Sequence, residues 1–134
     1  MQDCPTAAEL TETVAAFLLE EIRPEIKDPR LRFRLLIAAN VLTIAARELD
    51  EGEGPLLAEW ERLRDLLVKE DQTPPARAEA LQQETMAWSK SLCQRIRAGA
   101  YDHGEAWDRA FEHSYQTVVD KSRINNPRYL AKNG

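Results

Sequence analysis

The stretch RLRFRLLIAANVLTIAARELD, Arg30 to Asp50, is almost entirely apolar between Leu35 and Ala46, yet it carries one amide, Asn40, in its middle. Its length and its lack of glycine and proline predict a helix over about residues 29–50. A helix that is apolar round most of its circumference is usually central in its domain or lies at an oligomer interface. The architecture of the whole chain therefore depends on what packs around this segment.

The polar residues of this segment are not scattered. When residues are placed at about 100° per position, Asn40 falls in one narrow arc with Arg32, Thr43, Arg47 and Asp50. Three interpretations of this polar stripe are open. It is a solvent-facing strip, a buried network that ties helices together, or the floor of a polar pocket in which the arginines hold an anion such as phosphate or carboxylate.

Local signals predict helices along the rest of the chain. Thr6 and Glu9 have the spacing of a capping box that starts a first helix, and Pro24 kinks or ends that helix. Thr73 is placed to cap a later helix. No segment shows the alternation of a β-strand. We expect an all-α fold, one single-domain bundle of about five helices over 1–134. The expected helices are 6–26, 29–50, 55–70, 74–98 and 105–124, followed by a C-terminal latch at 125–134 that packs back on the bundle.

The apolar spacing also predicts which helix faces point inward. Two helices give the clearest inward stripes: Leu81, Thr85, Trp88, Leu92 and Ile96 on the fourth, and Trp107, Ala110, Phe111, Ser114 and Val118 on the fifth.

Charge is unevenly distributed along the chain. The net charge of the 134 residues is −5, which argues against a general nucleic-acid binder. Residues 1–26 carry −5, 27–47 carry +4, and 48–71 carry −6. We expect the basic cluster Arg30, Arg32 and Arg34 to pair with the acidic segments on either side of it.

Two further features bear on location. Cys4 and Cys93 match no metal or redox spacing, so two reduced thiols are expected. The opening residues lack the pattern of a signal peptide, and no run has the length of a transmembrane helix. A cytoplasmic protein without a membrane partner is the expectation.

Catalytic constellations are absent from the sequence pattern. The two histidines lack metal-ligand spacing, and no serine or cysteine has an identified base partner. Glutamate pairs at the i, i+3 spacing of magnesium-dependent helical hydrolases do occur, but such pairs arise easily among 23 acids. We therefore assign no catalytic residue, no metal and no cofactor, and favour a protein that is not an enzyme. The residues considered are His103, His113, Glu9 with Glu12, and Glu48 with Glu51.

Three segments together resemble a known family. They are PTAAELTETVAAFL at 5–18, RFRLLIAANVLTIAAREL at 32–49 and INNPRYL at 124–130, with IRAGAYD at 96–102 also fitting. The chain is similar to a bacterial family of small helical proteins classed as a domain of unknown function, numbered six-two-eight-five. The resemblance spans nearly the whole chain.

The resemblance implies a context, since members of that family are encoded beside acyl-CoA dehydrogenases and beside kinases similar to aminoglycoside phosphotransferases. It implies a non-catalytic accessory or binding protein that acts with one of these enzymes in acyl or hydroxyacyl catabolism. The alternative is a small helical enzyme or carrier that holds an anionic ligand at the polar stripe, and a homodimer is expected in either case. The candidate ligand-binding residues are Arg32, Asn40, Thr43, Arg47, Asn126, Arg128 and Tyr129.

Overall fold

The computed structural model describes residues 4–67 and 69–133, and within these ranges the chain is helical with no strand, as expected for the all-α class. The chain divides into two compact units, Met1–Gly52 and Glu53–Gly134. The expectation of one five-helix bundle stays a prediction.

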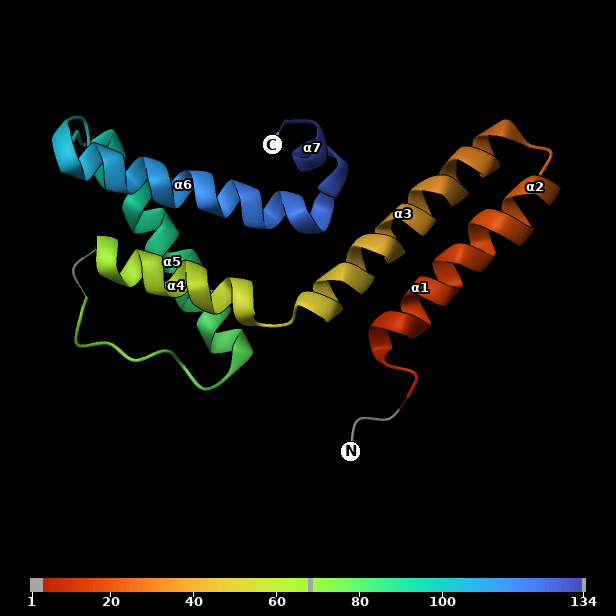
Figure 1. Ribbon diagram of the computed structural model, residues 1–134, viewed down its shortest axis with the longest axis horizontal. Coiled ribbons are helices and arrows are strands. Elements are labelled where there is room, and N and C mark those ends of the chain that lie inside the picture. The colour runs from red at the N-terminus through yellow and green to blue at the C-terminus, as the bar shows by residue number, and fades with distance from the viewer. Residues whose placement is uncertain (1–3, 68, 134) are drawn as a thin grey trace. The chain divides into compact units, whose positions relative to one another are not determined.

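Unit 1 is a helical hairpin (Figure 1). Its first arm is a continuous run of helix made of α1 (Ala7–Phe17), a π-helical turn η1 (Leu18–Ile22) and α2 (Arg23–Glu25), and its second arm is α3 (Pro29–Glu51). The capping box starts α1: the Thr6 backbone N–H donates to Glu9 Oε2 at 2.7 Å, and the Glu9 N–H donates to Thr6 Oγ1 at 3.2 Å. Both arms therefore begin as the sequence predicts.

Pro24 accounts for the end of the first arm. Proline lacks the backbone N–H that a regular α-helix needs at this point. The turn before it widens, and the Arg23 N–H donates to the Leu18 carbonyl in the π pattern. Helical structure then ends at Glu25, and Asp28 caps α3 by accepting from the Arg30 N–H at 3.0 Å.

Small side chains form the contact between the two arms. Ala15 of α1 and Ala39 and Ala46 of α3 are buried, and the two alanines of α3 lie seven residues apart on one face. Alanine at the contact lets two helices approach closely. Gly52 ends α3 at φ 63° and ψ −149°, a conformation that is open to glycine and disfavoured for other residues.

Unit 2 holds the larger core. It consists of α4 (Gly54–Leu66), α5 (Ala78–Arg97), α6 (Gly104–Asn125) and α7 (Pro127–Asn133), with α4 packed against both α5 and α6. The rings of Trp60 and Trp88 stack at its centre with centroids 5.0 Å apart. The buried cluster comprises Trp60, Leu63, Leu66, Leu67, Leu81, Trp88, Leu92, Tyr101 and Ala110.

Two helix bounds differ from the expectation. α5 begins at Ala78 after Arg77, which makes no side-chain cap, so the predicted cap at Thr73 is wrong. Thr73 and Pro74 each precede a proline, which disfavours helical backbone at both positions. α4 ends at Leu66, before the expected end at residue 70. Just beyond this end, the Lys69 N–H donates to the Arg64 carbonyl.

The C-terminal segment is helical. Asn126 interrupts the helix at φ −151°, as a residue before proline is expected to, and Pro127 then occupies the first position of α7. Leu130 is half-buried, whereas Tyr129, the other residue of the expected latch, is 56% exposed.

Candidate functional site

The polar stripe predicted on α3 runs beside its contact with α1. Thr43 is half-buried and its hydroxyl donates to the Ala39 carbonyl at 3.0 Å. Arg32 and Asn40 are exposed, and Arg47 is half-buried. The stripe is thus exposed at its two ends and half-buried at Thr43 and Arg47.

Arg47 lines a cleft of about 270 Å³ between α1 and α3. Three carboxylates share this cleft with one guanidinium, so its charge suits a cation or a basic side chain better than an anion. Hydrogen bonding by Thr6, chiefly through its backbone N–H, lowers the pKa of the Glu9 carboxyl, so the ionised form is favoured. The lining residues are Thr6, Ala8, Glu9, Glu12, Ala46, Arg47 and Asp50.

The C-terminal candidates lie in unit 2, apart along the chain from the stripe of unit 1. The Asn126 backbone N–H donates to the Ser122 carbonyl at 2.8 Å, and its own carbonyl accepts from the Tyr129 N–H at 3.0 Å. Arg128 is exposed. The structure therefore gives Asn126 a role in the turn between α6 and α7, and the ligand-binding assignment of these residues stays a prediction.

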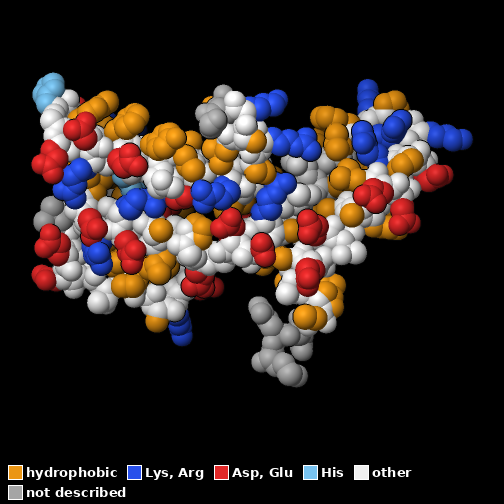
Figure 2. All heavy atoms as spheres, viewed as in Figure 1, with side chains coloured by type: hydrophobic (Ala, Val, Ile, Leu, Met, Phe, Trp, Pro, Cys, Tyr) orange, Lys and Arg blue, Asp and Glu red, His pale blue; other side chains and the backbone are white. Residues whose placement is uncertain are grey.

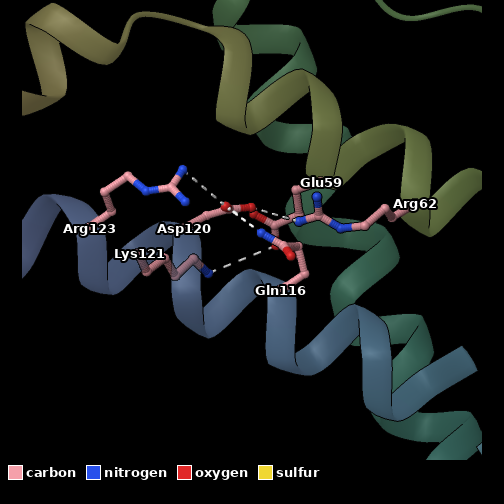
Figure 3. Close-up of polar contacts among 6 residues, drawn as sticks. All are labelled: Glu59, Arg62, Gln116, Asp120, Lys121 and Arg123. Carbon is pink, nitrogen blue, oxygen red and sulfur yellow. Dashed lines mark hydrogen bonds and ion pairs between the residues drawn. The ribbon is translucent and has the colours of Figure 1, made fainter. Parts of the chain in front are cut away.

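A polar seam that the sequence did not reveal joins α4 to α6 (Figure 3). Asp120 Oδ2 accepts from the Arg62 guanidinium at 3.1 Å, while its Oδ1 accepts from Gln116 Nε2 at 2.8 Å. Arg123 lies 3.9 Å from the same carboxylate, and Lys121 lies 3.8 Å from Glu59. The Asp120 side chain is only 15% exposed, so this pair is shielded from water on most sides.

His113 lies in the same interface and is 7% exposed. It lines a cleft of about 270 Å³ with Arg62, Asp65, Leu66, Arg109 and Glu112. Within the part of the chain that the structure describes, His113 Nδ1 and Arg62 Nε are buried without a hydrogen-bond partner. Burial, together with the positive charges of Arg62 and Lys121, lowers the pKa of His113, so its neutral form is favoured.

The outer surface of α6 is apolar. Trp107, Phe111 and Tyr115 recur every four residues, and their rings stack at centroid distances of 6.3 and 6.5 Å. Their exposed fractions are 53%, 59% and 56%, and Val118 extends the stripe at 59%. The predicted inward positions Trp107, Phe111 and Val118 are therefore wrong.

The buried side of α6 is the one that carries Ala110 and His113. This side lies roughly a third of a turn from the aromatic stripe. Asp120, further along α6, pairs with Arg62 of α4. An apolar cavity of about 150 Å³ adjoins the stripe, lined by Ile96, Tyr101, Asp102, Trp107, Ala110, Phe111 and Ser114.

Two observations on the described residues concern metal ligands and thiols. No group of three or more His, Cys, Asp or Glu side chains is placed there to hold a metal ion. Cys4 and Cys93 are both free and exposed. Among the described helices, none combines the length and apolar character needed to cross a membrane.

A family model described as "Domain of unknown function (DUF6285)" matches residues 24–129. The chain belongs to the DUF6285 family. The matched range includes α3, the polar seam and the aromatic face of α6, whereas α1 precedes it. Of the segments that carried the resemblance, 32–49 and 96–102 lie inside the match, and 5–18 lies outside it. No curated protein and no solved structure matches the chain.

Proposed function

We propose that this chain is a non-catalytic binding protein whose partner covers the outer face of α6. The observation that carries the proposal is the row of four large exposed side chains Trp107, Phe111, Tyr115 and Val118. Contiguous apolar surface of this kind marks interaction sites on soluble proteins.

The composition of the row supports a protein partner. Tryptophan and tyrosine are the residues that most often dominate binding energy at protein interfaces, because each removes a large area from water with few rotatable bonds. The stacked arrangement holds the three rings in one orientation before binding. Less conformational entropy is lost when a preorganised surface is covered.

The proposed partner is an acyl-CoA dehydrogenase or a kinase similar to aminoglycoside phosphotransferases. The support is the genomic context implied by the family resemblance. We propose that this chain acts with one of these enzymes in the cytoplasm, in the breakdown of acyl or hydroxyacyl compounds.

Co-purification tests this proposal. The full chain is co-expressed with each encoded neighbour, and we expect one of them to be recovered with it in stoichiometric amount. Trp107→Ala and Phe111→Ala should each reduce recovery by roughly tenfold or more, as for central aromatic anchors. Met86→Ala is the matched control, since Met86 is 54% exposed on α5 and lies outside the row.

Circular dichroism of each variant separates loss of binding from loss of folding. The proposal fails if neither enzyme is recovered with the natural chain. It also fails if Met86→Ala weakens recovery as much as the two aromatic substitutions.

A second candidate function is the holding of an anionic ligand, phosphate or carboxylate. The observation that favours it is the pair of buried, unpartnered nitrogens on His113 and Arg62 among the described residues. An anionic oxygen in that cleft would supply both with an acceptor and offset the positive charge around the imidazole. This places the ligand at α4 and α6 instead of at the Arg32, Asn40, Thr43 and Arg47 stripe.

Titration with inorganic phosphate and with acetate, followed by NMR, distinguishes the two locations. We expect the His113 ring resonances to shift in the natural chain and not in Arg62→Gln, with Arg64→Gln as the control. Shifts at the Asn40 amide instead would place the anion on α3. An unchanged spectrum at both locations would remove this candidate.

A further inference from the structure

The side of α3 that faces away from α1 carries a regular seam. Starting at Arg30, the residues that lie on this side follow one another at alternating intervals of four and three positions, which is the spacing of a heptad repeat. Because Ala39 and Ala46 face α1, helix geometry places this seam on the opposite side of α3. The seam consists of Arg30, Arg34, Ile37, Val41, Ile44, Glu48 and Glu51.

Most of the seam is exposed. Ile37 is 48% exposed and Val41 57%, while Ile44 is half-buried, and Phe33 beside them is 63% exposed. The charged residues at both ends of the seam are exposed as well. α3 thus buries alanines against α1 and leaves the larger side chains of Ile37 and Val41 exposed.

The order of charges along the seam is self-complementary. Two arginines precede the apolar centre and two glutamates follow it. Among the described residues, the side chains of Arg30 and Arg34 form no ion pair, so the pairing expected with neighbouring acidic segments is not seen there. Basic side chains gather at the end of unit 1 where α2 passes to α3 (Figure 2).

We propose that this seam is a homodimer interface, in which α3 packs antiparallel against α3 of a second copy about a two-fold axis. An axis near the level of Ala39 sets Ile37 against Val41 of the second copy. The same register sets Arg30 against Glu48 of the second copy, and symmetry makes each contact twice. This proposal uses unit 1 and does not depend on the partner proposed for α6.

A second copy fits this face better than an unrelated partner. An antiparallel occupant must carry basic, apolar and acidic residues in the same order along its own direction, and α3 itself has that order. Its 23 residues extend over about 34 Å, enough for three heptads. A parallel pairing would bring the arginines of the two copies together and is disfavoured.

The test is the mass of the full chain in solution, measured by sedimentation equilibrium over a range of concentrations. We expect a dimer that dissociates on dilution. Val41→Asp should raise the dissociation constant by roughly tenfold or more, because it places two carboxylates in the apolar centre. Met86→Asp is the matched control, since Met86 is 54% exposed on α5 and lies outside both α3 and the aromatic row of α6.

Charge exchange tests the register. Arg30→Glu alone and Glu48→Arg alone should each weaken the dimer by about three- to tenfold. The double variant, which restores opposite charges across the two-fold axis, should recover most of this loss. The dimer should also weaken as salt rises, because these pairs lie at the exposed ends of the seam.

Three results would overturn the proposal. They are a natural chain that stays monomeric at every concentration, a dimer that survives Val41→Asp but not Met86→Asp, and a double variant no stronger than the single ones. Circular dichroism of Val41→Asp confirms that the helices remain formed, so that loss of the dimer is not loss of the fold.

Discussion

The indole Nε1 of Trp60 donates a hydrogen bond to the Glu84 carboxylate at 2.8 Å and thereby ties α4 to α5. Trp60 is fully buried, and its ring also stacks on Trp88. Arg64 lies over the same ring at 5.5 Å from its centroid. A single side chain therefore joins apolar packing, a hydrogen bond and a cation–π contact in the core of unit 2.

Trp60→Phe removes the donor and part of the ring while keeping an aromatic group. We expect a loss of about 1–3 kcal/mol in the free energy of unfolding, because Glu84 loses its partner and a small cavity forms. Urea denaturation followed by circular dichroism measures it. Trp107→Phe, at an exposed tryptophan, should change stability by less than about 0.5 kcal/mol, and an equal loss there would contradict this account.

Asp120→Asn keeps the shape of the side chain at the polar seam but removes its charge. We expect a loss of about 1–2 kcal/mol, since Arg62 stays largely shielded from water without a counter-charge. Asp65→Asn is the control, because the Asp65 side chain, which pairs with Arg64, is 56% exposed. A surface pair of that kind contributes about 0–1 kcal/mol, so the smaller loss should come from Asp65.

His113 should make stability depend on pH. Its pKa in the folded chain is lowered from 6.5 by burial and by Arg62 and Lys121, so the unfolded chain binds the proton more tightly. The contribution of neutral His113 to the free energy of unfolding is fully present above pH 6.5 and declines as the pH falls toward the lowered pKa. His113→Gln should flatten this decline in denaturation curves taken across that window, with His103→Gln as the control for loss of an exposed histidine.

Thr6→Ala should loosen the start of α1. The substitution removes the hydroxyl that accepts from the Glu9 N–H, and loss of such a cap costs about 1 kcal/mol. Hydrogen exchange of the first-turn amides of α1 measures it locally. Thr13→Ala changes an exposed threonine inside the same helix, whose hydroxyl bonds to the Glu9 carbonyl, and should leave those amides protected or slightly better protected.

Helix positions were largely predictable because their causes are local. Asp28 with Pro29 starts α3, Gly52 ends it, and both act through backbone atoms a few residues away. The failure at Thr73 is also local in origin, since consecutive prolines keep the segment extended beyond its cap. The resemblance to a family was likewise readable from the chain, and the family match confirms it.

Helix faces were less predictable, and α6 shows why. Its apolar side chains spread over more than one side, so periodicity favoured the aromatic stripe as the inward face. In the structure, α6 instead buries His113 and pairs Asp120 with Arg62 of α4. Arg62 and Asp120 are separated by 58 positions, and no local pattern links them.

The sequence by itself determined that the chain is helical, where most helices begin and end, and that a polar stripe crosses an otherwise apolar α3. Tertiary structure decided which side of each helix is covered. Burial depends on the shape and charge of the neighbouring helix, and the residue pattern of a single helix contains no information on either. Ala39 is buried on the side of α3 that faces α1, whereas Val41, two residues further on, is 57% exposed.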